Sequence, residues 1–579
     1  MAEPTQWWMF HGDPAHTGYV TGSTINAAML ESGKFGLLHS MNVGGSILSV
    51  PAVCDGFIYV GLANSRLPGQ VSGKLKGGSL LKIDLTSYAT VQTFNWVIDP
   101  SERDAHGFCG MGSTPTVIGG FVYFVGFNAK LYCLDVDDFS KPVWVTDLRN
   151  ADLPHNQPIQ NFDSTDPNPP AAGWSAPLYV NGRLYLGIGE GENPNIYSFV
   201  FCLDAATGNV VWVFCTNQFV ANAANLPNHI PARAVVGDLP AMFTVQQGEP
   251  ITRGCSVWGN IAYDESLDRL YCPTGNGVPD GSLPTAGYSN GVLSLDASTG
   301  AFVAFMQTPP SSNYRQSDFD VDIGASPILF NLARRRVVGI GSKNGSFFVL
   351  DAETLEIISQ RQLLPYFNDG TEIPNINRHP SPEQMYNNVN NPAVDNLASD
   401  VNQGENYSGI YSTATIDPVS QTIFVGLGGK NYQTWGAGID TATTPFMRAM
   451  KYADLSDAWP VDDNDPPRYK NAMTGTMQSV ANGPSQILAM YQNEAESGLS
   501  TPAVVNDLVF MATTNVSIYA FRVSDGTPLW TDKLGEITQG MSGGYGYCMG
   551  PAICGDVVVA GALVYGNDGG ILKIYGPTP

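Results

Sequence analysis

The sequence predicts an all-β fold, an eight-bladed β-propeller with long rim loops, formed by residues 1–579 as a single domain. The main observation is a strand phrase that recurs about eight times, because short strand units that cannot bury their own apolar faces must stack or close into a ring. Composition agrees: Gly is 63, Pro 40 and charged residues only 14%, which suits turns between half-buried strands. A ring of blades explains the length better than several separate domains do.

Each copy of the phrase contains small residues or Pro, an apolar run, a turn and a second apolar run. Pro is the usual third residue, whereas we expect Trp258 to occupy that place in the fourth copy. The copies begin at Ser49, Ser113, Ser175, Ser256, Ala325, Tyr411, Ser500 and Met549.

Turns and tryptophans complete the predicted blade. Several copies close on Leu-Asp-x-x-Thr-Gly, as at Asp204 and Asp296, and these residue types supply turn chemistry. We expect Trp144, Trp212 and Trp530, which follow such turns, to fill the wedge between adjacent blades. Trp7 and Trp8 are expected in a first strand that pairs with the last blade and closes the ring.

Four polar insertions separate the blade units. Loops of this size in a compact ring are expected on one rim, where they carry function. They span residues 154–173, 220–250, 368–404 and 454–497.

The net charge of −24 argues against a nucleic-acid partner and against binding to anionic lipid. A solvated acidic surface is the ordinary interpretation, and a channel for cations or a basic partner protein is the alternative. No apolar run is long enough for a membrane span. No signal peptide is visible after Met1. We therefore expect a secreted or periplasmic mature form from which the signal has been removed, with a cytoplasmic protein as the alternative.

Nine cysteines are present without a C-x-x-C pair, so a zinc knuckle or a thioredoxin-type motif is not indicated. Most lie in apolar strand contexts, where buried free thiols are expected. The histidines form no H-E-x-x-H motif, and no phosphate-binding glycine loop is found. Gly540-Met-Ser-Gly-Gly fits G-x-S-x-G, but another blade follows it instead of the helix that a hydrolase requires.

Several segments resemble the PQQ-dependent (pyrroloquinoline quinone) quinoprotein alcohol dehydrogenase-like family. The turn Leu-Asp-x-x-Thr-Gly-x-x-x-Trp resembles the family signature, and the opening from Trp8 to Gly18 resembles the polyvinyl-alcohol-dehydrogenase-like branch. Three more specific matches occur in family order, and the resemblance covers most of the chain. They span residues 254–276, 318–327 and 341–351.

The resemblance implies a cofactor site for PQQ and Ca²⁺. Trp258 matches the floor under the quinone ring, and Lys343 matches the cation at the quinone oxygens. Asn276 and Glu192 match oxygen ligands of the metal, with Glu190 as an alternative. The structural alternatives are an inter-blade tryptophan, a turn lysine, a turn asparagine and a loop carboxylate.

Two departures from the family pattern are visible. The catalytic aspartate is expected where Ala286 or Thr285 stands, and Asp280 is the carboxylate that a rearranged loop could bring to the site as the base. The family often has adjacent cysteines over the cofactor, whereas Cys109 stands alone here. An acidic cluster at residues 318–322 fits either a metal site or turn capping.

The resulting hypothesis is a PQQ- and Ca²⁺-dependent alcohol dehydrogenase that oxidises a small-molecule or polymeric alcohol. No C-x-x-C-H motif is present, so its electron acceptor is expected to be a separate molecule. The alternative is a propeller without the catalytic aspartate that serves as a non-redox binding scaffold or catalyses a different reaction in the central pocket.

Overall fold

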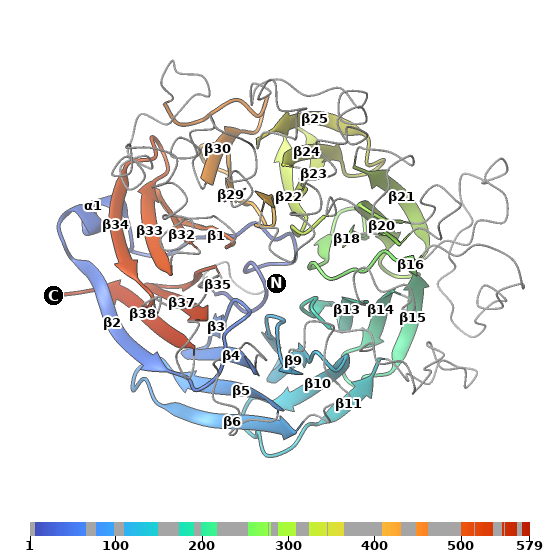
Figure 1. The fold of residues 1–579 in the computed structure, drawn as a ribbon, viewed down its shortest axis with the longest axis horizontal. Coiled ribbons are helices and arrows are strands. Elements are labelled where there is room, and N and C mark those ends of the chain that lie inside the picture. The colour runs from blue at the N-terminus through green and yellow to red at the C-terminus, as the bar shows by residue number, and fades with distance from the viewer. Residues whose placement is uncertain are drawn as a thin grey trace, which may run out of the picture.

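The computed structural model shows a closed ring of eight sheets around one axis, which confirms the predicted eight-bladed β-propeller (Figure 1). We refer to the sheets as blades A to H in chain order. The structure describes residues 6–64, 77–97, 109–148, 173–189, 198–216, 253–275, 277–278, 288–308, 323–343, 345–363, 408–429, 447–460, 500–513, 516–535, 547–548, 550–563 and 570–579. That the whole chain forms one domain stays a prediction.

Each blade is an antiparallel meander that runs from a short inner strand to the rim. Blade A contains β3 (Ala52–Cys54), β4 (Phe57–Asn64), β5 (Gly77–Asp84) and β6 (Thr90–Val97), and blade B contains β8 (Thr116–Ile118), β9 (Phe121–Val125), β10 (Lys130–Asp135) and β11 (Trp144–Asp147). Blade C contains β12 (Leu178–Val180), β13 (Arg183–Ile188), β14 (Phe199–Asp204) and β15 (Val210–Cys215). Blade D contains β17 (Ala262–Asp264), β18 (Arg269–Thr274), β20 (Gly291–Asp296) and β21 (Phe302–Gln307).

Blades E to H repeat this arrangement with small variations. Blade E contains β22 (Ile328–Leu332), β23 (Arg335–Gly341), β24 (Ser346–Asp351) and β25 (Ile357–Gln362), and blade F contains β27 (Thr415–Asp417), β28 (Thr422–Gly426) and β30 (Met447–Lys451). Blade G contains β31 (Ala503–Val505), β32 (Leu508–Ala512), β33 (Ser517–Arg522) and β34 (Pro528–Lys533). Blade H contains β36 (Ala552–Cys554), β37 (Val557–Leu563) and β38 (Ile571–Pro577).

Short ladders extend several blades at the ends of their strands. They are formed by β7 (Cys109–Gly110) with β4, β16 (Arg253–Gly254) with β19 (Gly277–Val278), β26 (Ser408–Gly409) with β29 (Gly428–Gly429), and β35 (Tyr547–Cys548) with β37. A single short helix, α1 (Ala27–Glu31), is found among the described residues, and none there is long and apolar enough to cross a bilayer.

The ring closes through β2 (Phe35–Asn42), which pairs antiparallel with β38 and becomes the outer strand of blade H. The prediction that Trp7 and Trp8 form the closing strand is therefore wrong. Trp7 instead makes an isolated bridge with Val53 in the inner strand of blade A. This pairing joins the beginning of the chain to the last blade and covers the outer edge of β38.

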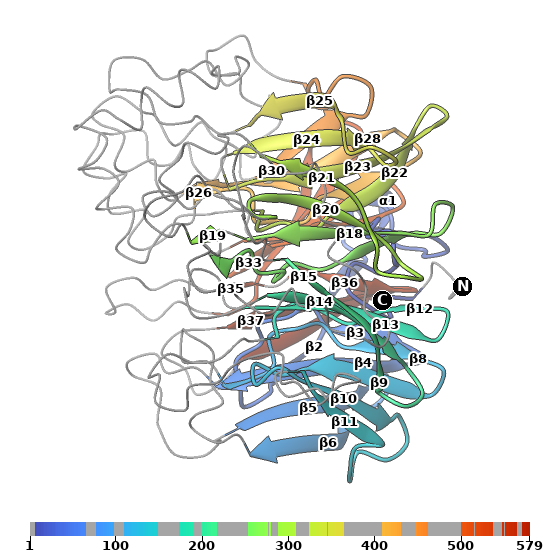
Figure 2. The same ribbon diagram turned by 90° about the vertical axis from the view of Figure 1, so that its right-hand side faces the viewer.

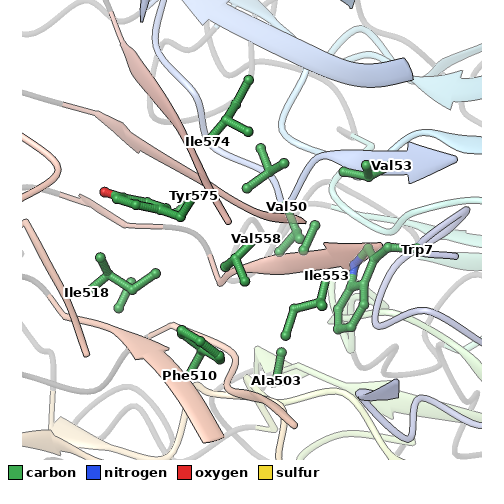
Figure 3. Packing of buried hydrophobic residues seen from close by; sticks show 14 of the residues in the cluster. Trp7, Val50, Val53, Ala503, Phe510, Ile518, Ile553, Val558, Ile574 and Tyr575 are labelled. Carbon is green, nitrogen blue, oxygen red and sulfur yellow. The ribbon is translucent and has the colours of Figure 1, made fainter. Parts of the chain in front are cut away.

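A hydrophobic core lies at the point where the ring closes (Figure 3). Trp7, with 1% of its surface exposed, packs beside Val53 of blade A and Ile553 of blade H. Phe510 of blade G and Tyr575 of blade H extend the same cluster. The first and last segments of the chain thus share one core with three blades.

The Asp-x-x-Thr-Gly turns have a clear local cause. The Asp204 carboxylate accepts hydrogen bonds from the Thr207 N–H (3.1 Å) and the Thr207 hydroxyl (2.9 Å), and Gly208 follows with φ +72°. Asp296 holds Thr299 in the same way. A positive φ favours glycine because a Cβ atom crowds the backbone there.

The turn glycine also receives a tryptophan from the preceding blade. Trp144 of blade B donates its indole N–H to the Ala205 carbonyl in the turn of blade C (3.2 Å), and Trp212 donates to Ala297 of blade D in the same way (3.1 Å). Trp530 contacts Tyr575 of blade H, with 4.9 Å between ring centroids. The predicted packing of these tryptophans between blades is confirmed.

We expect Gly208→Ala to destabilise the protein by about 2–4 kcal/mol, because it combines positive-φ strain with overpacking. A Cβ atom at position 208 would lie 2.5 Å from the Trp144 ring. Gly56 is a matched control, since it has φ +80° and a Cβ atom there would meet nothing within 4 Å. Urea unfolding should give a loss of only about 1 kcal/mol for Gly56→Ala, and equal losses for the two variants would contradict the inter-blade role.

Residues 6–20, which we call the N-terminal segment, lie along the inner strands at the centre of the ring (Figure 1). Its backbone carbonyls accept one N–H from the second residue of the inner strand in six blades. The donors are Val53, Val117, Tyr263, Leu329, Ile416 and Val504, with N···O distances between 2.7 and 3.0 Å. The end of the segment, β1 (Tyr19–Val20), adds to blade G as a parallel strand.

Two buried histidines fix this segment to distant blades. The His11 Nδ1 donates to the His16 carbonyl (2.6 Å), and the His11 Nε2 lies 3.3 Å from the Pro502 carbonyl. The His16 Nδ1 donates to the Pro327 carbonyl (2.9 Å). Each side chain is only 1% exposed. Burial lowers the pKa of His11 to about 4 and that of His16 to about 3, so both are neutral near pH 7.

This burial predicts a loss of stability in mild acid. In the unfolded chain the histidines have a pKa of 6.5 and bind protons, whereas in the folded protein they stay neutral down to a lower pH. The free energy of unfolding therefore falls as the pH drops below 6.5 toward 4. His11 alone accounts for a change on the order of 3 kcal/mol across its shift from 6.5 to about 4. Burial raises the pKa of neighbouring Asp13, which acts in the opposite direction.

Urea midpoints measured between pH 4 and 7.5 test this, with the double variant His11→Asn and His16→Asn as the comparison. Asn can still donate to a carbonyl but does not titrate, so we expect the midpoint of the double variant to depend less steeply on pH. Parallel pH curves for the two proteins would contradict the prediction.

Each of the four insertions follows the outermost strand of one blade and precedes the inner strand of the next blade. The outermost blade strands before them are β11, β15, β25 and β30, and the inner strands after them are β12, β17, β27 and β31. The outer strands β11, β15 and β25 end, and the next inner strands begin, at one face of the ring. The turns that join the first strand to the second and the third strand to the fourth lie at the other face (Figure 2). The insertions themselves lie outside the described residues, apart from Gly173 and residues 454–460.

The cysteine prediction is confirmed for the side chains that the structure describes. Cys54, Cys133, Cys202 and Cys272 are free and buried, and Cys554 is free and partly buried. Cys255 is buried as well. Burial raises the pKa of the Cys272 thiol far above its usual value, so this group is an inert apolar side chain.

Candidate functional site

The proline of the recurring strand phrase has a fixed place in the blade. Pro51, Pro115 and Pro177 each stand directly before the inner strand of their blade. In blade D that place belongs to Ile261, because the inner strand β17 begins at Ala262. The expectation that Trp258 replaces the proline is therefore wrong, and Trp258 lies three residues earlier.

Trp258 instead occupies what we call the pre-strand position, four residues before the inner strand begins. The same position holds Trp174 in blade C, Gly324 in blade E and Tyr411 in blade F. The three aromatic side chains are partly exposed at this position, although the residues that directly follow them are buried. Consecutive blades therefore present aromatic rings and one glycine at the start of their inner strands.

Lys343 reaches between two of these rings. It follows β23 by two residues, and its Nζ lies 5.0 Å from the ring centroid of Trp258 and 4.9 Å from that of Tyr411. Both distances are within the range of a cation–π interaction. An ammonium group is thus held between an indole and a phenol from the two neighbouring blades.

Gly324 makes this arrangement possible. A Cβ atom at position 324 would lie 3.1 Å from Trp258, 3.2 Å from the Lys343 Cε and 3.2 Å from Tyr411. Any larger side chain would occupy the space in which the three groups meet. The site therefore requires a residue without a side chain at position 324 of blade E.

A similar arrangement without a charge occurs in blades B and C. Phe127 stands in blade B at the place that Lys343 has in blade E, and it contacts Trp174 with 4.6 Å between ring centroids. Gly112 again supplies the space, since a Cβ atom there would lie 2.4 Å from Phe127 and 3.3 Å from Trp174. The charged version of the arrangement, in blades D to F, is the stronger candidate for recognition of a polar ligand.

A chain of hydrogen bonds underlies these positions from blade C to blade F. The Ala176 N–H donates to the Asn260 side-chain oxygen (2.7 Å), and the Asn260 N–H donates to the Ser326 hydroxyl (2.9 Å). The Ser326 N–H in turn donates to the Thr413 hydroxyl (3.0 Å). Each of these four residues stands two places after the pre-strand residue of its blade.

The backbone beside Trp258 is closely packed as well. A Cβ atom on Gly187 would lie 2.1 Å from the Val257 carbonyl oxygen, and one on Gly259 would lie 2.8 Å from Pro273. These glycines allow the strands of blades C and D to approach the segment that carries Trp258. The position of its Cα atom is therefore tightly constrained.

The structure brings together two of the side chains that the sequence proposed, Trp258 and Lys343. For Cys109 it describes only the backbone, which pairs with Asn64 in the β7–β4 ladder. The remaining candidates lie outside the described residues: Glu190, Glu192, Asn276, Asp280, Thr285, Ala286, Asp318, Asp320 and Asp322. Across the described ranges, no group of three His, Cys, Asp or Glu side chains is placed to bind a metal ion.

Sequence reasoning did not identify Tyr411 and Gly324 as site residues. Their signal was present, because each stands at the same distance from its inner strand as Trp258 does. The signal was hidden by the register error in the fourth phrase copy. An alignment of the copies on the inner strands finds both.

Comparison with known proteins agrees with the fold. Residues 235–360, which contain Trp258 and Lys343, match a family model described as "PQQ: Glucose/ethanol/alcohol dehydrogenase, beta-propeller domain". Quinohemoprotein alcohol dehydrogenase ADH IIB of Pseudomonas putida is 30% identical over 370 residues, which are 61% of this chain and 46% of that protein. Lupanine 17-hydroxylase [cytochrome c] of a Pseudomonas species is 30% identical over 212 residues, which are 35% of this chain and 29% of that protein. The match thus spans less than half the length of these curated relatives.

Solved structures show the same fold across the whole chain. Quinohemoprotein alcohol dehydrogenase from Comamonas testosteroni has a TM-score of 0.62 at 16% identity, covering 100% of this chain and 82% of that one. A europium-containing methanol dehydrogenase has a TM-score of 0.61 at 17% identity, covering 99% of this chain and 98% of that one.

The fold and the site together define an eight-bladed propeller with a cationic, aromatic site at the start of its inner strands. In sequence, residues 235–360 and the relatives make the chain distantly similar to PQQ-dependent quinoprotein alcohol dehydrogenases.

Proposed function

We propose that the protein is a PQQ- and Ca²⁺-dependent alcohol dehydrogenase that passes electrons to a separate acceptor. The observation that carries this proposal is the Lys343 ammonium group held between Trp258 and Tyr411. A planar, oxygen-rich and anionic cofactor needs a flat apolar surface and a positive charge, and this arrangement offers both.

The described residues fit the quinone by their chemistry. Trp258 is partly exposed and offers an indole face on which a planar ring can stack. The Lys343 amine lies against two aromatic rings, and it would supply positive charge where negative charge develops on the quinone oxygens. When bound, PQQ supplies the electron acceptor for alcohol oxidation.

The metal and the base belong to the same proposal. Glu192 and Asn276 would supply oxygen ligands for Ca²⁺, and Cys109 would contact the cofactor, in line with the resemblance to the family. Asp280 is proposed as the carboxylate that accepts the alcohol proton, since Ala286 and Thr285 cannot. The substrate would be a small or polymeric alcohol, and the similarity of the opening segment to the polyvinyl-alcohol-dehydrogenase-like branch supports the latter.

Reconstitution with PQQ and Ca²⁺ tests the proposal. We expect a bound quinone spectrum and dye reduction with primary or secondary alcohols, and we expect Trp258→Ala to weaken quinone binding. Failure of the wild-type protein to bind PQQ would contradict the dehydrogenase proposal. Binding without turnover would support the alternative function, a binding scaffold that lacks the catalytic aspartate.

A further inference from the structure

We propose that Asn260 is a positioning residue that fixes Trp258 and Lys343 relative to each other. This inference rests on the proposed function, because it concerns the same cofactor site. Asn260 lies two residues after Trp258, and the bonds described above join it to blades C and E. It would act through the backbone and through neighbouring blades.

The argument begins with the origin of the three site residues. Trp258 belongs to blade D, Lys343 to blade E and Tyr411 to blade F, so their mutual distances depend on how three separate sheets are placed. Within the described residues, these three sheets share no strand pairing with each other. Contacts between blades must therefore set the geometry of the site.

Asn260 supplies three such contacts. Its Oδ1 accepts the Ala176 N–H of blade C at 2.7 Å, and its backbone N–H and Nδ2 both donate to the Ser326 hydroxyl of blade E, at 2.9 and 3.1 Å. Ser326 stands two residues after Gly324, the glycine against which Trp258, Lys343 and Tyr411 meet. Asn260 thus joins the segments that carry Trp258 and Gly324.

The bond from Ser326 to Thr413 carries this connection to blade F. The Ser326 N–H donates to the Thr413 hydroxyl at 3.0 Å, and Thr413 stands two residues after Tyr411. Ser326 and Thr413 are each only 3% exposed, so water does not compete well for these bonds. One continuous run of bonds therefore joins the backbone segments that carry Trp258, Gly324 and Tyr411, the three residues around the Lys343 side chain.

The same run shows which replacement should preserve the function of Asn260. At the equivalent place in blades E and F, the hydroxyls of Ser326 and Thr413 accept the N–H of the preceding blade. A serine at position 260 can accept the Ala176 N–H in the same manner, whereas an alanine cannot. Asn260→Ser is therefore the conservative variant, and Asn260→Ala is the disruptive one.

The experiment measures two properties of the full-length protein. The first is the rate at which Lys343 is acetylated, followed by mass spectrometry from pH 7 to 10 without cofactor. The second is the dissociation constant for PQQ in the presence of Ca²⁺. For Asn260→Ala we expect both to change by about tenfold, with faster acetylation and weaker binding. We expect Asn260→Ser to have an acetylation rate and a PQQ dissociation constant close to those of the wild-type protein.

Thr116→Val is the matched control, because the Thr116 hydroxyl also makes a buried bond between blades, to the Pro177 carbonyl. It lies in blade B, away from Lys343, so it should lower the urea midpoint without changing the acetylation of Lys343 or PQQ binding. Equal effects of Asn260→Ala and Thr116→Val would overturn the positioning role, as would unchanged acetylation in Asn260→Ala. If the wild-type protein does not bind PQQ, the proposed function fails, while the acetylation data still decide the role of Asn260.

Discussion

Lys343→Ala is expected to lower alcohol-dependent dye reduction by about 10²–10³ fold in the PQQ- and Ca²⁺-loaded protein. The reason is electrostatic: the Lys343 Nζ is the charge held between Trp258 and Tyr411, and it would stabilise negative charge on the quinone oxygens. The effect should appear in kcat more than in KM for the alcohol, since the lysine would act on the cofactor. Steady-state kinetics with saturating PQQ measure both.

Lys82→Ala is a matched control for this substitution. The Lys82 Nζ also lies over an aromatic ring, 4.1 Å from the centroid of Phe57, and it donates to the Val136 carbonyl (2.7 Å). Because Lys82 joins blade A to blade B, its loss should lower stability and leave kcat unchanged. Equal losses of kcat in the two variants would contradict the role proposed for Lys343.

Trp7→Ala is expected to destabilise the protein by about 3–5 kcal/mol, the usual cost of deleting a fully buried tryptophan. Trp7 is 1% exposed, exchanges two backbone hydrogen bonds with Val53, and packs in the core where blades A, G and H meet. The substitution leaves a cavity at the point where the ring closes. Urea unfolding measures the change in free energy.

Trp174→Ala provides the comparison, because the same atoms are removed from a partly exposed side chain at a pre-strand position. Its expected loss is about 1–2 kcal/mol, since less apolar surface returns to water. A Trp7→Ala protein no less stable than Trp174→Ala would show that the N-terminal segment does not support ring closure.

The sequence was sufficient to predict the ring because its strongest signals are local. Asp204, Thr207 and Gly208 form their turn through contacts within five residues, and Trp144 and Trp212 recur at fixed distances from such turns. Six of the phrase copies also carry a proline directly before the inner strand. Local signals of this kind survive in one sequence without any alignment.

The closing strand could not be predicted in this way. β2 is an outer strand whose partner, β38, lies more than five hundred residues later, so nothing near Phe35–Asn42 specifies the pairing. Trp7 and Trp8 are large and apolar, and the structure buries both inside the ring instead of in a closing strand. Apolar character predicts burial but does not say against which blade.

The site was predicted in part, for a similar reason. Trp258 and Lys343 were found through the family resemblance, and the structure places the Lys343 amine over the Trp258 ring. Tyr411 and Gly324 are recognisable through the position that they share across blades, which requires the register of the inner strands. Their contribution depends on three sheets meeting, and no single segment of sequence records that.

The pairing of β2 with β38 and the bonds of the N-terminal segment have a consequence for how the chain reaches its native state. Ser23 donates to the Asp556 carboxylate across 533 residues, and the His11 ring meets the Pro502 carbonyl across 491. Contacts so distant in sequence must wait until the blades between them have formed, because the entropy cost of closing the loop is paid before the contact stabilises anything. Single blades can assemble early from neighbouring hairpins, but the circle is completed late. We therefore expect refolding to end in a slow step in which β2 pairs with β38, and the edges of both strands are unpaired until then.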